Sequence, residues 1–317
     1  ASSGALVFGT FNNTSGAPLN VAGSGSFTLA SGNSVVVTNT GSALGAGSYK
    51  LISKSGTASV AGTAPSTVTV AGNGLSAGHS ASLTITSGEL FLTVVLDPPG
   101  LPTSVAASDG TSTAHVTVTW TAAPGATSHE VYRNTANNTS SGSNLGTQTT
   151  PFNDSGADPG QLYYYFVRGV NSGGNGNWSA SDTGYRALAA PTGVAASDGT
   201  STAHVTVTWS AVTGATSYRV YRNTVNNSGT AQDLGVQTSG FNDTTSTNGV
   251  LYYYWVRAEA SSSSSQSAFS SSDTGYRALT APANVAASDG TSTAHVTVTW
   301  DAVTGATSYR VYRNTVN

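Results

Sequence analysis

The chain has 317 residues, of which only 8% are charged, against about 25% in ordinary soluble domains, and its net charge is −3. The eleven Lys and Arg are scattered, which excludes the basic surface of a nucleic-acid-binding protein or of one that binds anionic membranes. Apolar runs reach only about eight residues, far short of a membrane span. Because cysteine is absent, disulfides and thiolate metal sites are excluded.

Residues 1–97 form a series of short apolar segments separated by glycine-containing turns. This spacing, without helical periodicity, predicts a glycine-rich all-β domain and fits either a β-solenoid or an antiparallel sandwich. The strands are expected at Leu6–Phe8, Leu19–Val21, Phe27–Leu29, Val35–Val37, Tyr49–Ile52, Val68–Val70, Leu83–Ile85 and Leu90–Leu96. Three prolines in residues 98–102 then predict a stiff linker, since proline removes backbone donors from a sheet.

Part of this segment resembles a known family. The run GSYKLISKSG (Gly47–Gly56), followed by GNGLSAG and ASLTITSGELFLTVVL, is similar to the end of the autotransporter-associated β-strand repeats of bacterial surface proteins. The resemblance covers Gly23–Leu96 and implies a right-handed parallel β-helix.

A block of sixteen residues, Val105–Trp120, returns unchanged at Val194–Trp209 and Val285–Trp300. Within it apolar residues alternate with threonine up to the tryptophan, which predicts a strand with one buried face. The spacing indicates a first repeat at 103–188, a second at 189–279 and a partial third at 280–317. The tryptophans Trp120, Trp209 and Trp300 are the expected centres of their cores.

The repeats resemble the bacterial form of the fibronectin type III domain from Leu101 onward. The resemblance rests on the block's tryptophan, a Phe-Asn-Asp turn at 152–154, Pro159-Gly160 and a Tyr-x-Tyr-x-Val strand at 163–167. It implies seven-stranded β-sandwiches without catalysis, and a tyrosine corner at Tyr163 and Tyr252 whose hydroxyls bond a backbone group upstream. The integrin-binding tripeptide Arg-Gly-Asp is absent from the sequence.

Strand alternation also predicts an outward aromatic row on the long strand of each repeat. Tyr164 and Phe166, with Tyr253 and Trp255, are expected to be exposed or covered by an interface. The row fits domain packing or edge cover, a subunit contact or a glycan contact. A surface rich in Ser, Thr and Asn is also a plausible glycan carrier. The Asn-x-Ser/Thr sequons begin at Asn12, Asn13, Asn137, Asn138, Asn153, Asn177, Asn226 and Asn242.

No catalytic, cofactor or metal site is predicted. The histidines of the repeated block (His115, His204, His295) lack partners at ligand spacing, as do His79 and His129, and the aspartates that precede glycine or follow Phe-Asn fit turns better than calcium ligands. Gly74–Gly78 matches G-x-S-x-G, but without a following helix it predicts only a glycine-rich turn.

The third repeat should supply only three strands, the last at Tyr309–Arg313, and leave Val296, Val298 and Trp300 uncovered. Two explanations are open: a continuing chain, or completion by a strand of another subunit, with Ala5–Phe11 as the donor.

The sequence therefore favours a secreted, extracellular structural protein of a bacterial surface, a fibre or adhesin-stalk component rather than an enzyme. Its expected partners are other copies of itself and glycans. The alternatives are the accessory modules of a secreted polysaccharide-degrading enzyme and a carbohydrate-binding surface module.

Overall fold

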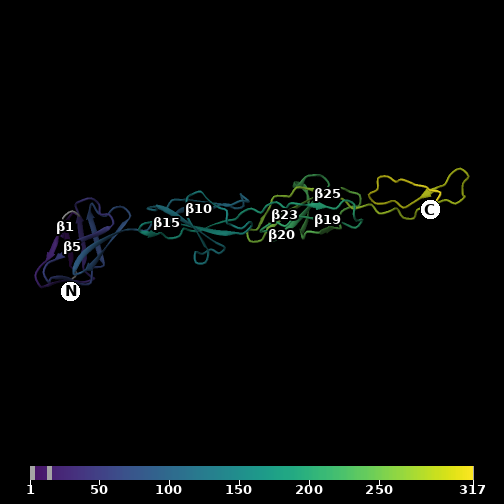
Figure 1. Ribbon diagram of the computed structural model, residues 1–317. Coiled ribbons are helices and arrows are strands. Elements are labelled where there is room, and N and C mark those ends of the chain that lie inside the picture. The colour runs from purple at the N-terminus through teal and green to yellow at the C-terminus, as the bar shows by residue number, and fades with distance from the viewer. Residues whose placement is uncertain (1–3, 13–15, 317) are drawn as a thin grey trace.

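The computed structural model describes residues 4–12 and 16–316, so the sequon residue Asn13 lies outside the described part of the chain. The described residues form a row of separate bodies between the two termini (Figure 1). The fold is all-β, and the described chain has one short helical turn, the 3-10 helix η1 (Ser228–Thr230). No helix in these residues is long or apolar enough to cross a membrane.

The first body is built from short strands joined by tight turns. Its described strands are β1 (Ala5–Phe11), β2 (Leu19–Val21), β3 (Ser26–Leu29), β4 (Ser34–Asn39), β5 (Gly47–Lys54), β6 (Ser59–Gly62), β7 (Thr67–Gly72), β8 (His79–Thr86) and β9 (Glu89–Leu96). Strand β6 is absent from the sequence-based prediction, because Val60 is its one large apolar residue. His79, expected in a loop, begins β8.

Parallel pairing organises these strands. β1, β4 and β7 pair in parallel, as do β2 with β5 and β3 with β6. The partner lies 33 residues further along the chain in β2–β5 (Leu19↔Ile52) and β3–β6 (Ser26↔Ser59). A similar offset in every parallel pair, 29 residues in β1–β4 (Ala5↔Ser34) and 33 in β4–β7 (Ser34↔Thr67), means that each turn of the chain lies on the turn before it, which is a solenoid-like arrangement and not an antiparallel sandwich. The antiparallel hairpin β8–β9 then joins β5 through β9.

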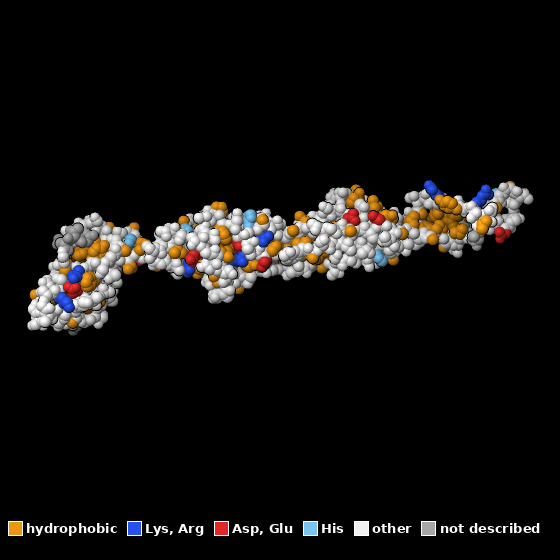
Figure 2. Space-filling view, viewed as in Figure 1, with side chains coloured by type: hydrophobic (Ala, Val, Ile, Leu, Met, Phe, Trp, Pro, Cys, Tyr) orange, Lys and Arg blue, Asp and Glu red, His pale blue; other side chains and the backbone are white. Residues whose placement is uncertain are grey.

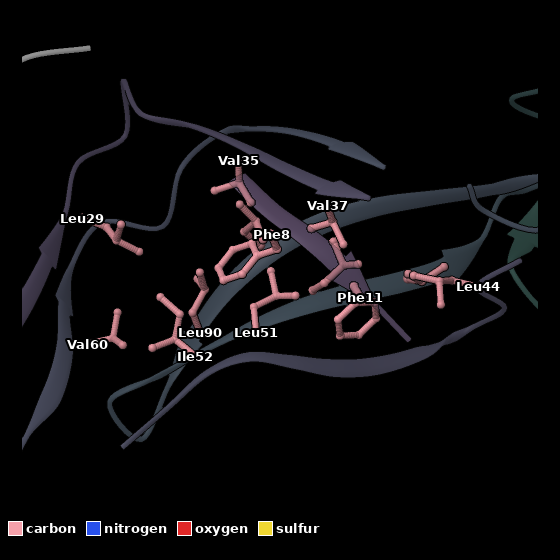
Figure 3. Close-up of a cluster of buried hydrophobic side chains, with 13 residues drawn as sticks. Phe8, Phe11, Leu29, Val35, Val37, Leu44, Leu51, Ile52, Val60 and Leu90 are labelled. Atoms are coloured by element: carbon pink, nitrogen blue, oxygen red, sulfur yellow. The ribbon is translucent and has the colours of Figure 1, made fainter. Parts of the chain in front are cut away.

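The core of this body is a cluster of aliphatic and aromatic side chains (Figure 3). Alternation along β4 buries Val35 and Val37, which lie with Phe8 against residues of β5 and β9. Strand β1 already has a partner, since it pairs with β4 and buries Phe8 and Phe11. The expectation that Ala5–Phe11 is free to act as a donor rests on its beginning without a partner, and that premise is wrong, since β4 is its partner.

Glycines with positive φ allow the turns of the solenoid to stack closely. Gly72 has φ +70, and a Cβ there would lie 2.2 Å from the carbonyl oxygen of Asn39 on the neighbouring turn. Gly74 has a similar φ, +62, but the nearest atom to its Cβ position is 4.0 Å away. A comparison of substitutions at Gly72 and Gly74 therefore distinguishes the effect of backbone strain from that of steric contact.

We expect Gly72→Ala to destabilise the first body much more than Gly74→Ala. Both variants bear the ~1–2 kcal/mol strain of a left-handed alanine, and Gly72→Ala adds an overpacking cost of roughly 1–3 kcal/mol. Hydrogen exchange of β4 and β7 amides in the full chain measures the difference. Equal exchange in the two variants would contradict the stacking.

The two complete repeats have the same order of strands. In the first these are β10 (Thr103–Ala107), β11 (Val116–Thr121), β12 (Ser128–Asn134), β13 (Ser143–Gln148), β14 (Phe152–Asp154), β15 (Tyr163–Asn171), β16 (Gly174–Asn175) and β17 (Asp182–Gly184). In the second they are β18 (Ala195–Ala196), β19 (Val205–Thr208), β20 (Ser217–Asn223), β21 (Gln232–Gln237), β22 (Phe241–Asp243), β23 (Tyr252–Ala260), β24 (Ser265–Gln266) and β25 (Asp273–Gly275).

Each repeat is a sandwich of two antiparallel sheets. In the first repeat β10-β11-β14 form one sheet, and β13-β12-β15-β16, with β17 also on β15, form the other. Along β11 Val116, Val118 and Trp120 are buried while Thr119 and Thr121 are exposed, as the period of two predicts. These side chains meet Val131 and Val167 of the opposite sheet in one core.

The third repeat is open. Its described strands are β26 (Ala286–Ala287) and β27 (Val298–Thr299), and the strand expected at Tyr309–Arg313 does not form. Val296 is 65% exposed, and Val298 and Trp300 are partly exposed. Figure 2 shows hydrophobic side chains gathered on this body, at the opposite end from the solenoid.

Candidate functional site

The tryptophan of each complete repeat is buried against a second ring. Trp120 and Trp209 are 6% and 7% exposed, and their rings lie 5.8 and 5.6 Å from those of His129 and Tyr218. His129 Nε2 accepts a hydrogen bond from the backbone N–H of Ala123 at 3.0 Å, and the Tyr218 hydroxyl occupies the same place in the second repeat. Burial lowers the pKa of His129, which favours this neutral, accepting form. The ring therefore closes the turn that follows the tryptophan strand.

The tyrosines at the start of the long strand bond the chain upstream. The Tyr163 hydroxyl donates to Asp158 Oδ2 at 3.0 Å and accepts from the Asp158 backbone N–H at 3.5 Å. The Tyr252 hydroxyl accepts from the backbone N–H of Thr247 at 3.4 Å. Both rings thus hold a backbone group five residues before them, the geometry that the tyrosine-corner resemblance implies.

A buried ion pair lies beside these tyrosines in each complete repeat. Arg133 Nη1 donates to Asp154 Oδ2 at 2.7 Å, and the Tyr165 hydroxyl donates to the same oxygen at 2.9 Å. The Arg133 guanidinium also lies over the Tyr163 ring, 4.6 Å from its centroid. Asp154 is the buried last residue of β14, and its Oδ1 accepts from the backbone N–H of Gly156 at 3.0 Å, so it forms the predicted turn and also belongs to this ion pair, which the sequence did not predict.

The second repeat contains the same trio of a buried aspartate with an arginine and a tyrosine bound to it. Arg222 Nη1 lies 2.6 Å and the Tyr254 hydroxyl 2.8 Å from Asp243 Oδ2, and Asp243 is 1% exposed. The trio was not predicted from the sequence, although a signal was present: the same arginine, aspartate and tyrosine recur in both complete repeats of a chain that is only 8% charged.

The trio makes the second repeat sensitive to acid. Burial alone would raise the pKa of the Asp243 carboxyl. The hydroxyls of Thr245 and Tyr254, together with the Arg222 guanidinium, outweigh burial and hold that pKa below its usual range. Since the folded pKa lies below the unfolded one, the ionised carboxylate contributes stability that is lost as the pH falls through the folded value.

We therefore expect the melting temperature of the second repeat to fall steeply below about pH 4, the unfolded pKa of aspartate. Asp243→Asn should melt lower at pH 7 but depend less on pH between about 5 and 2, because the titrating group is gone. Thermal melts of the full chain across this range measure both effects. An unchanged pH dependence in the variant would contradict the assignment.

The outward aromatic row is largely covered, as the interpretation of domain packing or edge cover expects. Phe166 and Trp255 are 6% and 4% exposed, and Tyr164 and Tyr253 are partly exposed. Across the sheet, Phe166 is paired with Tyr132, whose ring centroid lies 6.5 Å away. In the second repeat the rings of Tyr253 and Trp255 stack at 6.2 Å.

Two loops of the same repeat lie over this row. The Tyr132 ring contacts Trp178 at 5.4 Å, and Trp178 lies 4.4 Å from the Arg168 guanidinium. The loop at 135–142 joins this segment, because Ser181 Oγ donates to Asn137 Oδ1 at 2.8 Å. In the second repeat the Tyr221 and Phe269 rings lie 4.9 Å apart, and Ser272 donates to Asn226. The row therefore packs against the repeat's own chain, which leaves only Tyr164 and Tyr253 for contact with a partner.

The described residues hold no group of three or more His, Asp or Glu side chains that could bind a metal ion. His79 Nδ1 lies 3.0 Å from the carbonyl oxygen of Ala77, and Ser76 Oγ donates to the Ala43 carbonyl. The G-x-S-x-G serine thus lies in the turn between β7 and β8.

No protein-family model matches the chain, and no curated protein matches it. Among solved structures, the chicken CNTN1 FN1-FN3 domains are 19% identical, with 63% of this chain and 77% of that chain covered and a TM-score of 0.28. A two fibronectin type-III domain segment from chicken tenascin is 16% identical, with 55% and 97% covered and a TM-score of 0.43. An Fn3-like protein from Clostridium thermocellum is 28% identical, with 28% and 93% covered and a TM-score of 0.26.

Proposed function

We propose that the protein is an extracellular structural spacer, a stalk or fibre component made of tandem β domains. The observation that carries the proposal is the row of bodies in Figure 1, in which a solenoid-like body is followed by sandwiches with the same core and the same ion-pair trio. Burial of the outward aromatic rows by loops of the same repeat supports it, because the surface that remains is rich in hydroxyl groups and poor in charge.

The family assignments belong to this proposal. The three-stranded and five-stranded sheets of the complete repeats, with tyrosines that bond the chain upstream, support a fibronectin type III relationship. Parallel stacking in residues 5–72 supports a relationship to the β-strand repeats of bacterial surface proteins. Secretion, glycosylation of the Ser/Thr/Asn surface and assembly with other copies follow from the same proposal.

Surface location is tested with antibodies against the purified chain on intact cells that produce it. We expect labelling without permeabilisation and loss of the label after treatment with an external protease. Labelling that requires lysis of the cells would overturn the extracellular role.

The carbohydrate-binding alternative depends on the partly exposed Tyr164 and Tyr253. A glycan-binding module would show saturable binding to a panel of polysaccharides, weakened by Tyr164→Ala or Tyr253→Ala. A spacer would show no saturable polysaccharide binding in the parent chain. Saturable binding that is abolished by either variant would favour the carbohydrate-binding alternative.

A further inference from the structure

Consecutive repeats meet through backbone contacts at two glycines. The loop between β14 and β15 carries Pro159 and Gly160, and it lies against the turn between β19 and β20 that carries Gly214. A Cβ on Gly214 would lie 2.0 Å from the carbonyl oxygen of Pro159, and one on Gly160 would lie 2.7 Å from Cβ of Ala260. Gly160 and Gly214 both have positive φ, +71 and +84 respectively, so these positions favour glycine for conformation as well as for space.

The next joint is built in the same way. The loop between β22 and β23 carries Asn248 and Gly249, and the facing turn of the third repeat carries Gly305. A Cβ on Gly305 would lie 2.0 Å from the Asn248 carbonyl oxygen, and one on Gly249 would lie 3.1 Å from the Gly305 carbonyl oxygen. Two joints with the same geometry indicate a feature encoded in the repeat.

The connecting segment is held from both sides. Leu188 is 2% exposed and packs with Ala258 and Ala260 of the second repeat. Arg186 is bound to the first repeat, because Nη1 donates to the Ala157 carbonyl at 2.8 Å and Nη2 to the Thr113 carbonyl at 2.6 Å.

The arginine contacts recur in the second connection. Arg277 Nη1 donates to the Ser246 carbonyl and Nη2 to the Thr202 carbonyl, both at 2.6 Å. A further hydrogen bond crosses the first joint, from the backbone N–H of Leu162 to Ser262 Oγ at 2.8 Å.

We propose that the Pro-Gly or Asn-Gly loop of each repeat and the glycine turn of the next form a specific docking surface, whose partner is the neighbouring repeat of the same chain. This surface holds consecutive repeats at one fixed angle. A free linker of six residues, the length of 186–191, would have a root-mean-square span of about 13 Å and allow a wide range of angles. Here the contacts on both sides of Leu188 remove that freedom. A fixed angle gives the proposed spacer a defined shape, and the biological use of the docking surface rests on that proposed function.

The sequence offers a matched pair of variants. Gly214→Ala places a methyl group against the Pro159 carbonyl and should force the joint apart. Gly125 occupies the equivalent turn of the first repeat with φ +77, but no described atom lies within 4 Å of its Cβ position. Gly125→Ala therefore carries the same backbone strain without a clash at a joint.

The angle is measured by electron spin resonance between two labels on the full chain. Because the chain has no cysteine, Thr149→Cys and Thr238→Cys, at exposed matching positions, place the labels on either side of the first joint. We expect one narrow distance distribution in the labelled parent and in Gly125→Ala. In Gly214→Ala the distribution should broaden, as expected for two repeats joined by a flexible linker.

A broad distribution in the parent, or the same narrow distribution in Gly214→Ala, would overturn the proposal. If Gly214→Ala unfolds the second repeat, seen as fast hydrogen exchange of β20, Gly160→Ala repeats the test from the first repeat. The distance measurement uses only the purified chain, whereas the extracellular role is tested by antibody labelling of intact cells. The two proposals can therefore fail independently of each other.

Discussion

Replacing Asp243 by alanine is expected to lower the free energy of unfolding of the second repeat by about 3–5 kcal/mol. The side chain of Asp243 is 1% exposed and that of its partner Arg222 is 8% exposed. Removing the carboxylate leaves a guanidinium inside the repeat without its counter-charge, and the Tyr254 hydroxyl without its acceptor. Hydrogen exchange of β23 amides in the full chain, where Tyr254 lies, measures the loss for this repeat alone.

Asp233→Ala is the control for this experiment. Asp233 also pairs with an arginine of β20, at 2.9 Å from Arg219, but its side chain is 45% exposed. Such solvent-exposed pairs contribute about 0–1 kcal/mol, so exchange should change little. If the two variants lost equal stability, the buried trio would not be a determinant of the fold.

Trp120→Ala is expected to cost the first repeat about 3–5 kcal/mol, as large core truncations do. Trp120 joins β11 to the opposite sheet, and its loss would leave a cavity beside Val118 and Val131. In a domain of this size the midpoint of thermal unfolding should fall by more than about 10 °C. Scanning calorimetry of the full chain measures the shift.

Trp300→Ala is the matched control, since it lies in an identical block of sixteen residues. Trp300 is partly exposed in the open third repeat, and its substitution should leave the transition of the first repeat in place. A cost below about 1 kcal/mol for Trp120→Ala, in the range of surface substitutions, would show that the tryptophan strand does not bury its side chain.

Local pattern predicted much of this fold. The alternation of Val116, Val118 and Trp120 with threonines is a property of adjacent residues, and it identified both the strand and its buried face. Strand β6 was not predicted because Ser59–Gly62 consists mostly of small residues, and its position depends on pairing with β3. Whether the first body coils or folds into a sandwich depends on register between residues 33 apart, which no local pattern contains.

The candidate site shows the same division between local and long-range determinants. Alternation correctly placed Phe166 and Trp255 on the face opposite the core, but their exposure depends on loops that cross the sheet. The trio of Arg133, Asp154 and Tyr165 joins three strands and was missed. The joint between repeats involves residues 55 positions apart along the chain, Pro159 and Gly214, and its evidence is steric.

The central claim is that the domains stand in an extended row, and small-angle X-ray scattering of the purified full chain tests it most directly. A compact protein of 317 residues would have a radius of gyration of about 20 Å. The row in Figure 1 predicts a clearly larger value, with the scattering profile of an elongated particle. A radius of gyration near 20 Å would show that the domains fold back on one another and would contradict the account.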